Sequence, residues 1–249
     1  MGICIFIMGL CIGSFLNVCI YRIPRDESIA FPPSRCTNCS MKLKPYDIIP
    51  VISYIILGGK CRGCKEKISV KYPAVELFTG ILFYIIYMKF GLTIISLKFI
   101  VMVAFLIVIA GIDFSTQDVY SVTTFPCIAA GVVLLLVEKF YFNYSIGTYL
   151  TGFALGSGLI AFIVFLTGGM GEGDIEIAAI CGLFLGFKNT LVTLMFSFIV
   201  AAIYGVLLIV FKKKTRKDAI PFGPFLFIGA LIALMFGEGV VNSYLGYFI

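Results

Sequence analysis

Residues 158–174 have the sequence GLIAFIVFLTGGMGEGD, in which an uncharged apolar run meets a loop rich in glycine and acid. The apolar half belongs to a longer stretch, 147–167, which is long enough to cross the hydrocarbon core of a bilayer as a helix. The other half, 168–174, holds four glycines and the acids Glu172 and Asp174. Ionisable groups at membrane depth tend to mark function. This segment therefore predicts a membrane helix that ends at a functional loop.

The rest of the chain is as apolar as this segment. Of its 249 residues, 61% are hydrophobic and 13% are charged, against roughly half and a quarter in soluble domains. The apolar runs are continuous rather than alternating, which argues against a membrane β-barrel. We therefore predict an all-α, polytopic transmembrane helix bundle of about eight helices. Besides 147–167, the helices are expected at 2–20, 74–90, 94–112, 121–138, 173–187, 190–211 and 220–236.

Two of these stretches have distinctive features. The stretch 2–20 lacks the basic segment that precedes the apolar part of a secretory signal, so we expect it to be a retained first helix. The stretch 173–187 is short and is interrupted by Gly182 and Gly186, so the helix count depends on where this part of the chain turns.

The net charge of +6 is concentrated in two loops. Ten of the 19 Lys and Arg residues lie in 21–73 and five lie in 212–217. By the positive-inside rule both segments are cytoplasmic, which gives the charge a role in topology and at lipid headgroups, and we expect no nucleic acid partner. With the N-terminus outside, eight helices place four loops in the cytoplasm: 21–73, 113–120, 168–174 and 212–219. We divide the chain into a first helix (1–20), a cytoplasmic loop (21–73) and a membrane domain (74–249).

Four of the nine cysteines form two CxxC pairs in the cytoplasmic loop. These are Cys36, Cys39, Cys61 and Cys64, with 21 residues between the pairs. This spacing is typical of a closed, tetrahedral Cys4 zinc site that organises a loop and performs no chemistry itself. The alternative is a pair of disulfides, which a reducing cytoplasm disfavours. The other five cysteines lie in apolar stretches, where we expect them to be small packing residues.

Two aspartates lie at the cytoplasmic ends of predicted helices. Asp113 follows 94–112 in VIAGIDFSTQDVYS, and Asp174 ends the glycine-rich loop. The chain has no histidine, which excludes Ser-His-Asp and Cys-His catalysis. Two adjacent aspartates can share one proton and hydrolyse a peptide bond, one as base and one as acid.

Each aspartate also has a simpler interpretation. Gly171 and Gly173 permit a positive φ and a close backbone approach, so a GxGD turn could present Asp174 to an extended substrate strand. The same sequence also suits a loop in which Asp174 caps the next helix. Asp113 could equally be a solvated acid at a helix end.

Five segments, in order, resemble the type IV prepilin peptidase family, the bacterial GxGD-type membrane aspartyl proteases. They are GSFLNVCIYRIP (13–24), the CxxC pairs, KYPAVELFTG (71–80), Asp113, and GMGEGD (169–174) followed by IPFGPFL (220–226). The resemblance implies removal of the basic leader of prepilins or pseudopilins at the cytoplasmic face of the bacterial inner membrane. It also implies S-adenosylmethionine-dependent N-methylation of the new N-terminus. The catalytic pair carries over onto Asp113 and Asp174, and the tetracysteine loop onto the four CxxC cysteines.

The chain departs from the family pattern at two places. Val119-Tyr120-Ser121 stands where the family has Leu-Pro-Asp or Ile-Pro-Asn, which leaves Asp118 as a rival for the first catalytic acid. Glu176 replaces a common lysine and adds a negative charge close to Asp174.

The S-adenosylmethionine site is unknown from the sequence, which has no glycine-rich cofactor motif. Glu27 and Glu76 are candidate polar contacts, although each also suits a solvated or interfacial charge.

The sequence as a whole thus predicts a multi-pass membrane aspartyl endopeptidase with a structural zinc. Two rival interpretations remain open: a zinc-stabilised transporter in which Asp113 and Asp174 relay a cation, and a non-catalytic scaffold of a secretion machine.

Overall fold

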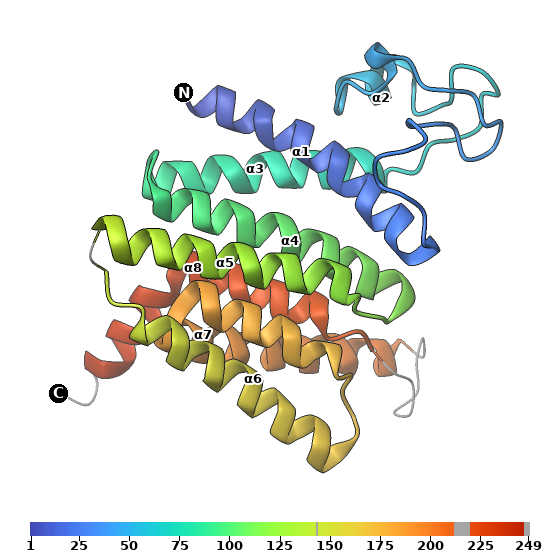
Figure 1. Ribbon diagram of the computed structural model, residues 1–249. Coiled ribbons are helices and arrows are strands. Elements are labelled where there is room, and N and C mark those ends of the chain that lie inside the picture. Colours follow the sequence, from blue (N-terminus) through green and yellow to red (C-terminus); the bar gives the residue numbers. More distant parts are fainter. Residues whose placement is uncertain (143, 212–219, 247–249) are drawn as a thin grey trace. The chain divides into compact units, whose positions relative to one another are not determined.

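The computed structural model of the chain describes residues 1–142, 144–211 and 220–246 (Figure 1). These residues are almost entirely helical and contain no β-strand, as the composition predicts. The chain divides into two compact units, Met1–Val108 and Ile109–Ile249. The predicted loop 212–219, with its five basic residues, lies outside the described residues.

The first unit contains two helices in backbone contact and a long loop between them. The helices are α1 (Gly2–Arg22) and α3 (Lys71–Phe90), and they approach so closely that a Cβ on Gly9 would lie 2.7 Å from Cα of Gly80. Small residues allow this packing in a membrane, where apolar burial alone does not hold helices together. The loop contains the short helices η1 (Ile23–Arg25), η2 (Pro45–Asp47) and α2 (Ile52–Ile56).

Arg22 fixes the start of this loop. Its guanidinium is buried and donates hydrogen bonds to the carbonyls of Ser28 (2.8 Å) and Pro32 (2.7 Å). Such charge-assisted bonds to two carbonyls turn the chain away from α1.

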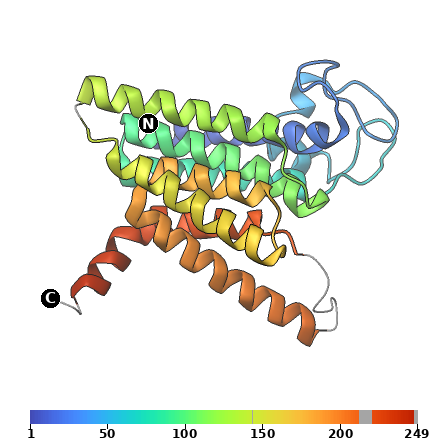
Figure 2. The ribbon, with the colours of Figure 1, turned by 60° about the horizontal axis from the view of Figure 1, so that its bottom comes forward.

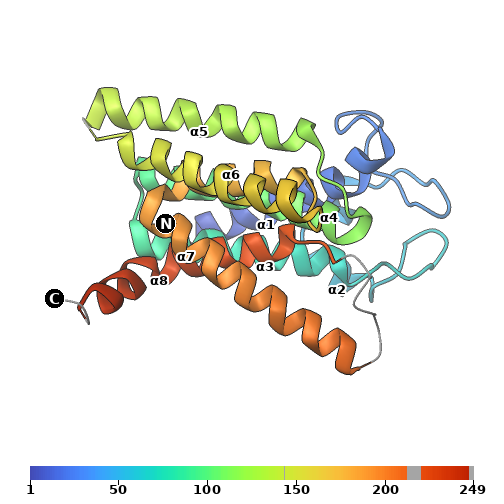
Figure 3. The ribbon, with the colours of Figure 1, turned by 90° about the horizontal axis from the view of Figure 1, so that it is seen from below.

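The helix α4 (Ile94–Thr116) passes from the first unit into the second, which also contains four long helices. They are α5 (Ser121–Phe142), α6 (Gly147–Thr167), α7 (Gly173–Val210) and α8 (Gly223–Gly246). Within this unit α7 packs against both α6 and α8 (Figure 3).

The helix α7 is not a straight rod, because it reverses at Gly186 (Figure 2). Gly186 has φ 76° and ψ 171°, which are not helical angles. A Cβ on Gly156 of α6 would touch both the carbonyl of Ala178 and, at 3.4 Å, the side chain of Thr190. Twelve residues span about 18 Å in a straight helix, so the two arms must fold back on each other.

This reversal explains the difference from the expected helix count. Among the described residues, seven helices are long and apolar enough to span a membrane. The predicted helices 173–187 and 190–211 are the two arms of α7, separated at one of the two glycines that the sequence indicated. The bounds 147–167 are confirmed, and α4 extends past the predicted end at 112 to Thr116.

Candidate active site and metal centre

Asp113 lies in the last turn of α4 and is 4% exposed. Its Oδ2 accepts a hydrogen bond of 2.8 Å from the backbone N–H of Gly223, the first residue of α8. The start of a helix also carries a partial positive charge, which favours a carboxylate. A Cβ on Gly223 would lie 2.6 Å from the same oxygen, so this contact requires glycine.

Asp174 is the second residue of α7 and is 6% exposed. Its backbone N–H donates to the carbonyl of Gly171 at 3.1 Å. The N-cap position belongs to Glu172, and no side-chain capping bond forms at this end of α7 among the described residues. The interpretation of Asp174 as a helix cap is therefore wrong, and its carboxylate is not engaged in capping.

Two glycines bring the segments that carry these aspartates together. A Cβ on Gly173 would overlap the side chain of Val119, in the loop that follows Asp113. A Cβ on Gly223 would lie 3.0 Å from Cδ1 of Ile177, one turn along α7 from Asp174. The two carboxylates are close enough for the charge of Asp113 to act on Asp174. Asp113 and Asp174 thus share one end of the second unit.

In the glycine-rich loop, glycine is needed mainly because neighbouring atoms lie too close for a Cβ, and less because of unusual dihedral angles. Within 168–174 only Gly168 has a positive φ, of 59°. Gly173 permits a close contact with Val119 of the same chain, whereas the predicted approach to a substrate strand remains a prediction. Gly171 lies beside the Asp174 carboxylate, but a Cβ there would be 3.8 Å from Oδ2, which is an ordinary contact.

Two other acids, Glu176 and Asp118, lie near Asp113 and Asp174, and they differ in their contacts and exposure. The Oε2 of Glu176 accepts a hydrogen bond from the Thr124 hydroxyl, which ties the first turn of α7 to α5. Asp118 is exposed and lies close enough to Asp113 for the two charges to interact.

The two CxxC pairs form a pair of turns with the same backbone hydrogen bonds. Cys36 N–H donates to Met41, and Cys61 N–H donates to Glu66, five residues on in each case. Each first cysteine also accepts from the residue four positions later, and that residue has a positive φ: Ser40 at 59° and Lys65 at 60°. The predicted pair of knuckles is therefore present.

The four thiols of these knuckles converge. Their sulfur atoms lie within 4.8 Å of one another, with Cys36 and Cys64 at 3.8 Å and Cys39 and Cys61 at 4.0 Å. Zn–S bonds of about 2.3 Å in a tetrahedron require sulfur atoms about 3.8 Å apart, so the cluster fits zinc. All nine cysteines are free thiols, so the alternative of two disulfides is wrong.

Polar groups around the knuckles support this arrangement. The backbone N–H groups of Cys64 and Gly63 lower the pKa of Cys61 to about 7, which favours the thiolate that a metal requires. Arg62 donates to Asp47 at 2.7 Å and 2.8 Å, and this hydrogen-bonded charge holds the pKa of Asp47 below its usual value.

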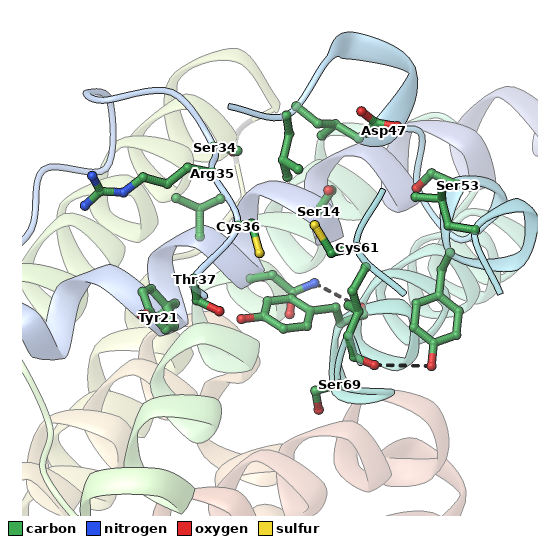
Figure 4. Close-up of a pocket in the computed structure, with 18 of the residues that line it drawn as sticks. Ser14, Tyr21, Ser34, Arg35, Cys36, Thr37, Asp47, Ser53, Cys61 and Ser69 are labelled. Atoms are coloured by element: carbon green, nitrogen blue, oxygen red, sulfur yellow. Dashed lines mark hydrogen bonds between the residues drawn. The ribbon is translucent and has the colours of Figure 1, made fainter. Parts of the chain in front are cut away.

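Glu27 and Glu76 both line a cavity of about 600 Å³ in the first unit (Figure 4). Glu27 is half-buried, and Glu76 is 8% exposed. The Oε2 of Glu76 accepts a hydrogen bond of 2.8 Å from the backbone N–H of Val51. The interpretation of Glu76 as a solvated charge is therefore wrong.

Sequence reasoning assigned no role to Gly223, Val119 or Thr124. Gly223 had a visible signal, since it is the glycine between two prolines in IPFGPFL at 220–226. Val119 belongs to a departure from the family pattern, but neither Val119 nor Thr124 had a signal for its contact, because these contacts depend on the packing of helices far apart in the chain.

Comparison with protein families gives two adjoining matches. Residues 7–90 match the bacterial peptidase A24 N-terminal domain, and residues 100–206 match the type IV leader peptidase family.

Curated relatives cover nearly the whole chain, and each is named a prepilin leader peptidase/N-methyltransferase. The Bacillus subtilis protein is 31% identical over 97% of this chain and 96% of its own length. The Pseudomonas aeruginosa protein is 31% identical over 98% and 93%, and the Neisseria gonorrhoeae protein is 32% identical over 94% and 90%. No solved structure matches the chain.

Proposed function

The chain belongs to the type IV leader peptidase family, and on that premise we propose that it is a multi-pass membrane aspartyl endopeptidase. Its substrate is the junction between the basic leader and the apolar helix of a type IV prepilin or pseudopilin. The observation that carries this proposal is that two buried carboxylates, Asp113 and Asp174, lie at the same end of the second unit, where Gly173 contacts Val119 and Gly223 contacts Asp113.

Asp113 and Asp174 perform the hydrolysis as a pair that holds one proton between them. The ionised carboxylate takes a proton from a water molecule, whose oxygen attacks the scissile carbonyl carbon. The protonated carboxyl donates to the substrate, the C–N bond breaks, and the departing amine receives a proton. Water is thereby divided between the new carboxyl and amino groups. The N–H of Gly223 fixes the orientation of Asp113 through this cycle.

Asp113 is preferred to Asp118 as the first acid for two reasons. Asp113 is buried beside the start of α8, whereas Asp118 is exposed. Burial raises the strength of every electrostatic interaction that a catalytic group makes. Asp118 remains close enough to influence the pair by its charge.

We place the site at the cytoplasmic face of the bacterial inner membrane. The loops after α4 and before α7 lie together with the start of α8, so all three share one end of the second unit. The positive-inside rule assigns that end to the cytoplasm through the basic residues of the connecting loops.

We propose that Cys36, Cys39, Cys61 and Cys64 hold a structural zinc. Four sulfur ligands leave no open coordination position, so the ion organises the loop 21–73 and takes no part in hydrolysis. A loop of this length and polarity cannot build its own apolar core, which is why a metal is needed.

A second activity follows from the names of the relatives. We propose that the new N-terminal amine is methylated, with S-adenosylmethionine supplying the methyl group. When bound, S-adenosylmethionine would supply a methyl group to the neutral N-terminal amine and would leave as S-adenosylhomocysteine, while the amine would lose one proton.

The test uses purified protein in detergent and a prepilin-like peptide with a Gly–Phe junction. Wild type is expected to cut the peptide, and D113N/D174N is expected to lose at least about a thousandfold in rate, since acid–base pairs supply factors of this order. An intact peptide with wild type contradicts the peptidase, and cutting by the double variant excludes these two acids. Loss of ion flux without loss of cleavage in D174N would instead support a transporter. Mass spectrometry with and without S-adenosylmethionine reports methylation in the same reaction.

A further inference from the structure

The cavity in the first unit is built as a ligand site. Its volume of about 600 Å³ lies within the range of roughly 300–1,000 Å³ that small-molecule sites occupy. Its floor comes from α1 and α3, and its walls come from the loop between them. Figure 4 shows the loop residues Cys36 and Cys61 beside Ser14 and Tyr21 of α1, while the Arg35 side chain extends away from them at the edge of the cavity.

Glu76 on the floor is a buried acid that lacks a cation. Its carboxylate accepts from the Val51 N–H and from the Ser14 hydroxyl, both of them neutral donors. Among the residues that the structure describes, Arg62 and Asp47 form an ion pair, and Glu76 forms none. A buried carboxylate costs several kcal/mol unless a counter-charge compensates it. A cationic ligand in the cavity supplies that counter-charge.

The segment between η2 and α2, which is hydrogen-bonded to Glu76, contains a residue in a strained conformation. Val51 has φ 61° and ψ −49°, a region that β-branched residues avoid. Such strain persists where surrounding contacts impose it, and it gathers at ligand sites. The bond from the Val51 N–H to Glu76 is one such contact, and it ties the segment between η2 and α2 to the cavity floor.

The basic and aromatic side chains that line the cavity indicate which other chemical groups the ligand carries. Arg22 is engaged by two carbonyls, while Arg35 and Lys67 line the cavity without an ion-pair partner among the described residues. The rings of Tyr21 and Tyr72 add aromatic surface that can stack on a base. The cavity therefore offers an acid for a cation, bases for a carboxylate and aromatic rings for a heterocycle.

We propose that this cavity is the S-adenosylmethionine site and that Glu76 is the counter-charge to the cationic part of the ligand. The molecule combines a sulfonium and an amine with a carboxylate and an adenine, which matches the lining. This inference rests on the methyl-transfer part of the proposed function. Because Cys36 and Cys61 also line the cavity, the knuckles that would hold zinc form part of its wall.

The first experiment measures binding by calorimetry on the full-length protein in detergent, with S-adenosylmethionine as the probe. Glu76→Gln is expected to weaken binding at least about tenfold, as expected for loss of a charged partner. Glu238→Gln, a change at an exposed acid in α8, is expected to bind like wild type. Equal affinity in Glu76→Gln and wild type would overturn the assignment. Zinc content and thermal midpoint report whether Glu76→Gln is folded.

The second experiment needs no variant. Wild type is irradiated with methyl-labelled S-adenosylmethionine, and the labelled peptides are identified by mass spectrometry. Label is expected within residues 14–76, and label confined to residues beyond 108 would overturn the assignment. Peptide cleavage is measured on the same sample. A preparation that cleaves but does not bind S-adenosylmethionine refutes this inference alone, whereas one that binds at the cavity but does not cleave refutes the peptidase.

Discussion

The cysteine cluster and the aspartate pair are two sites assembled in opposite ways. Each CxxC knuckle closes on itself through bonds between residues four and five positions apart, so the first unit needs only two short segments to meet. Asp113 and Asp174 come from different helices and meet because Gly173 and Gly223 let backbone approach neighbouring side chains. Local hydrogen bonding makes the first site, and helix packing makes the second. The two should therefore respond differently to substitution.

The strongest test of this difference is Gly223→Ala. The added Cβ would lie 2.6 Å from Asp113 Oδ2 and 3.0 Å from Ile177, so the carboxylate must move. A displacement of about 1 Å at a catalytic group can cost a hundredfold in rate, and we expect a loss of that order in peptide cleavage. Zinc content should not change.

The matched control is Gly239→Ala in the same helix, where a Cβ meets nothing within 4 Å. It should cleave like wild type. If the two variants were equally active, the contact between Gly223 and Asp113 would not position the catalytic acid.

The converse test is Cys36→Ser, which removes one of four sulfur ligands from the first unit. Zinc per protein is expected to fall at least about tenfold by elemental analysis, since a structural site depends on all its ligands. Cys11→Ser, at an exposed thiol in α1, should retain zinc. Cleavage should fall much less than zinc content. An equal loss of zinc content and of cleavage rate would contradict the independence of the two sites, because the aspartate pair would then depend on the metal.

A smaller effect is expected at Gly173. Alanine there would overlap Val119, and overpacking of this kind costs about 1–3 kcal/mol, so we expect cleavage to fall about tenfold. Val119→Gly in the same chain removes the atoms that the new Cβ meets and should restore most of the rate. Gly169→Ala has its nearest contact at 3.4 Å and should be near wild type. Additive losses in the double variant would contradict the proposed contact.

The same distinction explains what could be predicted from the sequence. The length of the continuous apolar runs located the membrane helices, and CxxC spacing located the thiol cluster, because both depend on nearby residues. Gly186 was visible as a helix interruption, but the fold-back of α7 depends on its contact with α6. The burial of Glu76 was missed for the same reason: its bond to Val51 joins α3 to a strained loop residue, and no short motif encodes that bond.

The smallest predicted effect is at the ion pair of Asp47 and Arg62, in which the Arg62 side chain is 45% exposed and the Asp47 side chain is 2% exposed. Solvent reaches Arg62 and screens its charge, so the pair contributes little, and Asp47→Asn is expected to speed zinc transfer to a chelator by about two- to fivefold. Asp26→Asn, at an exposed acid near the start of the same loop, should not change it.

The pH dependence of this effect follows from the hydrogen bond from Arg62, which lowers the pKa of Asp47 in the folded protein. A depressed carboxyl pKa gives stability that is fully present above the unfolded value of about 3.9 and is lost as the pH falls through the folded value. The ratio of the Asp47→Asn rate to the wild-type rate should therefore stay constant between about pH 6 and pH 8, although both rates rise as the thiolates gain protons. A ratio that changes across this range would mean that Asp47 acts through the cysteines rather than through Arg62.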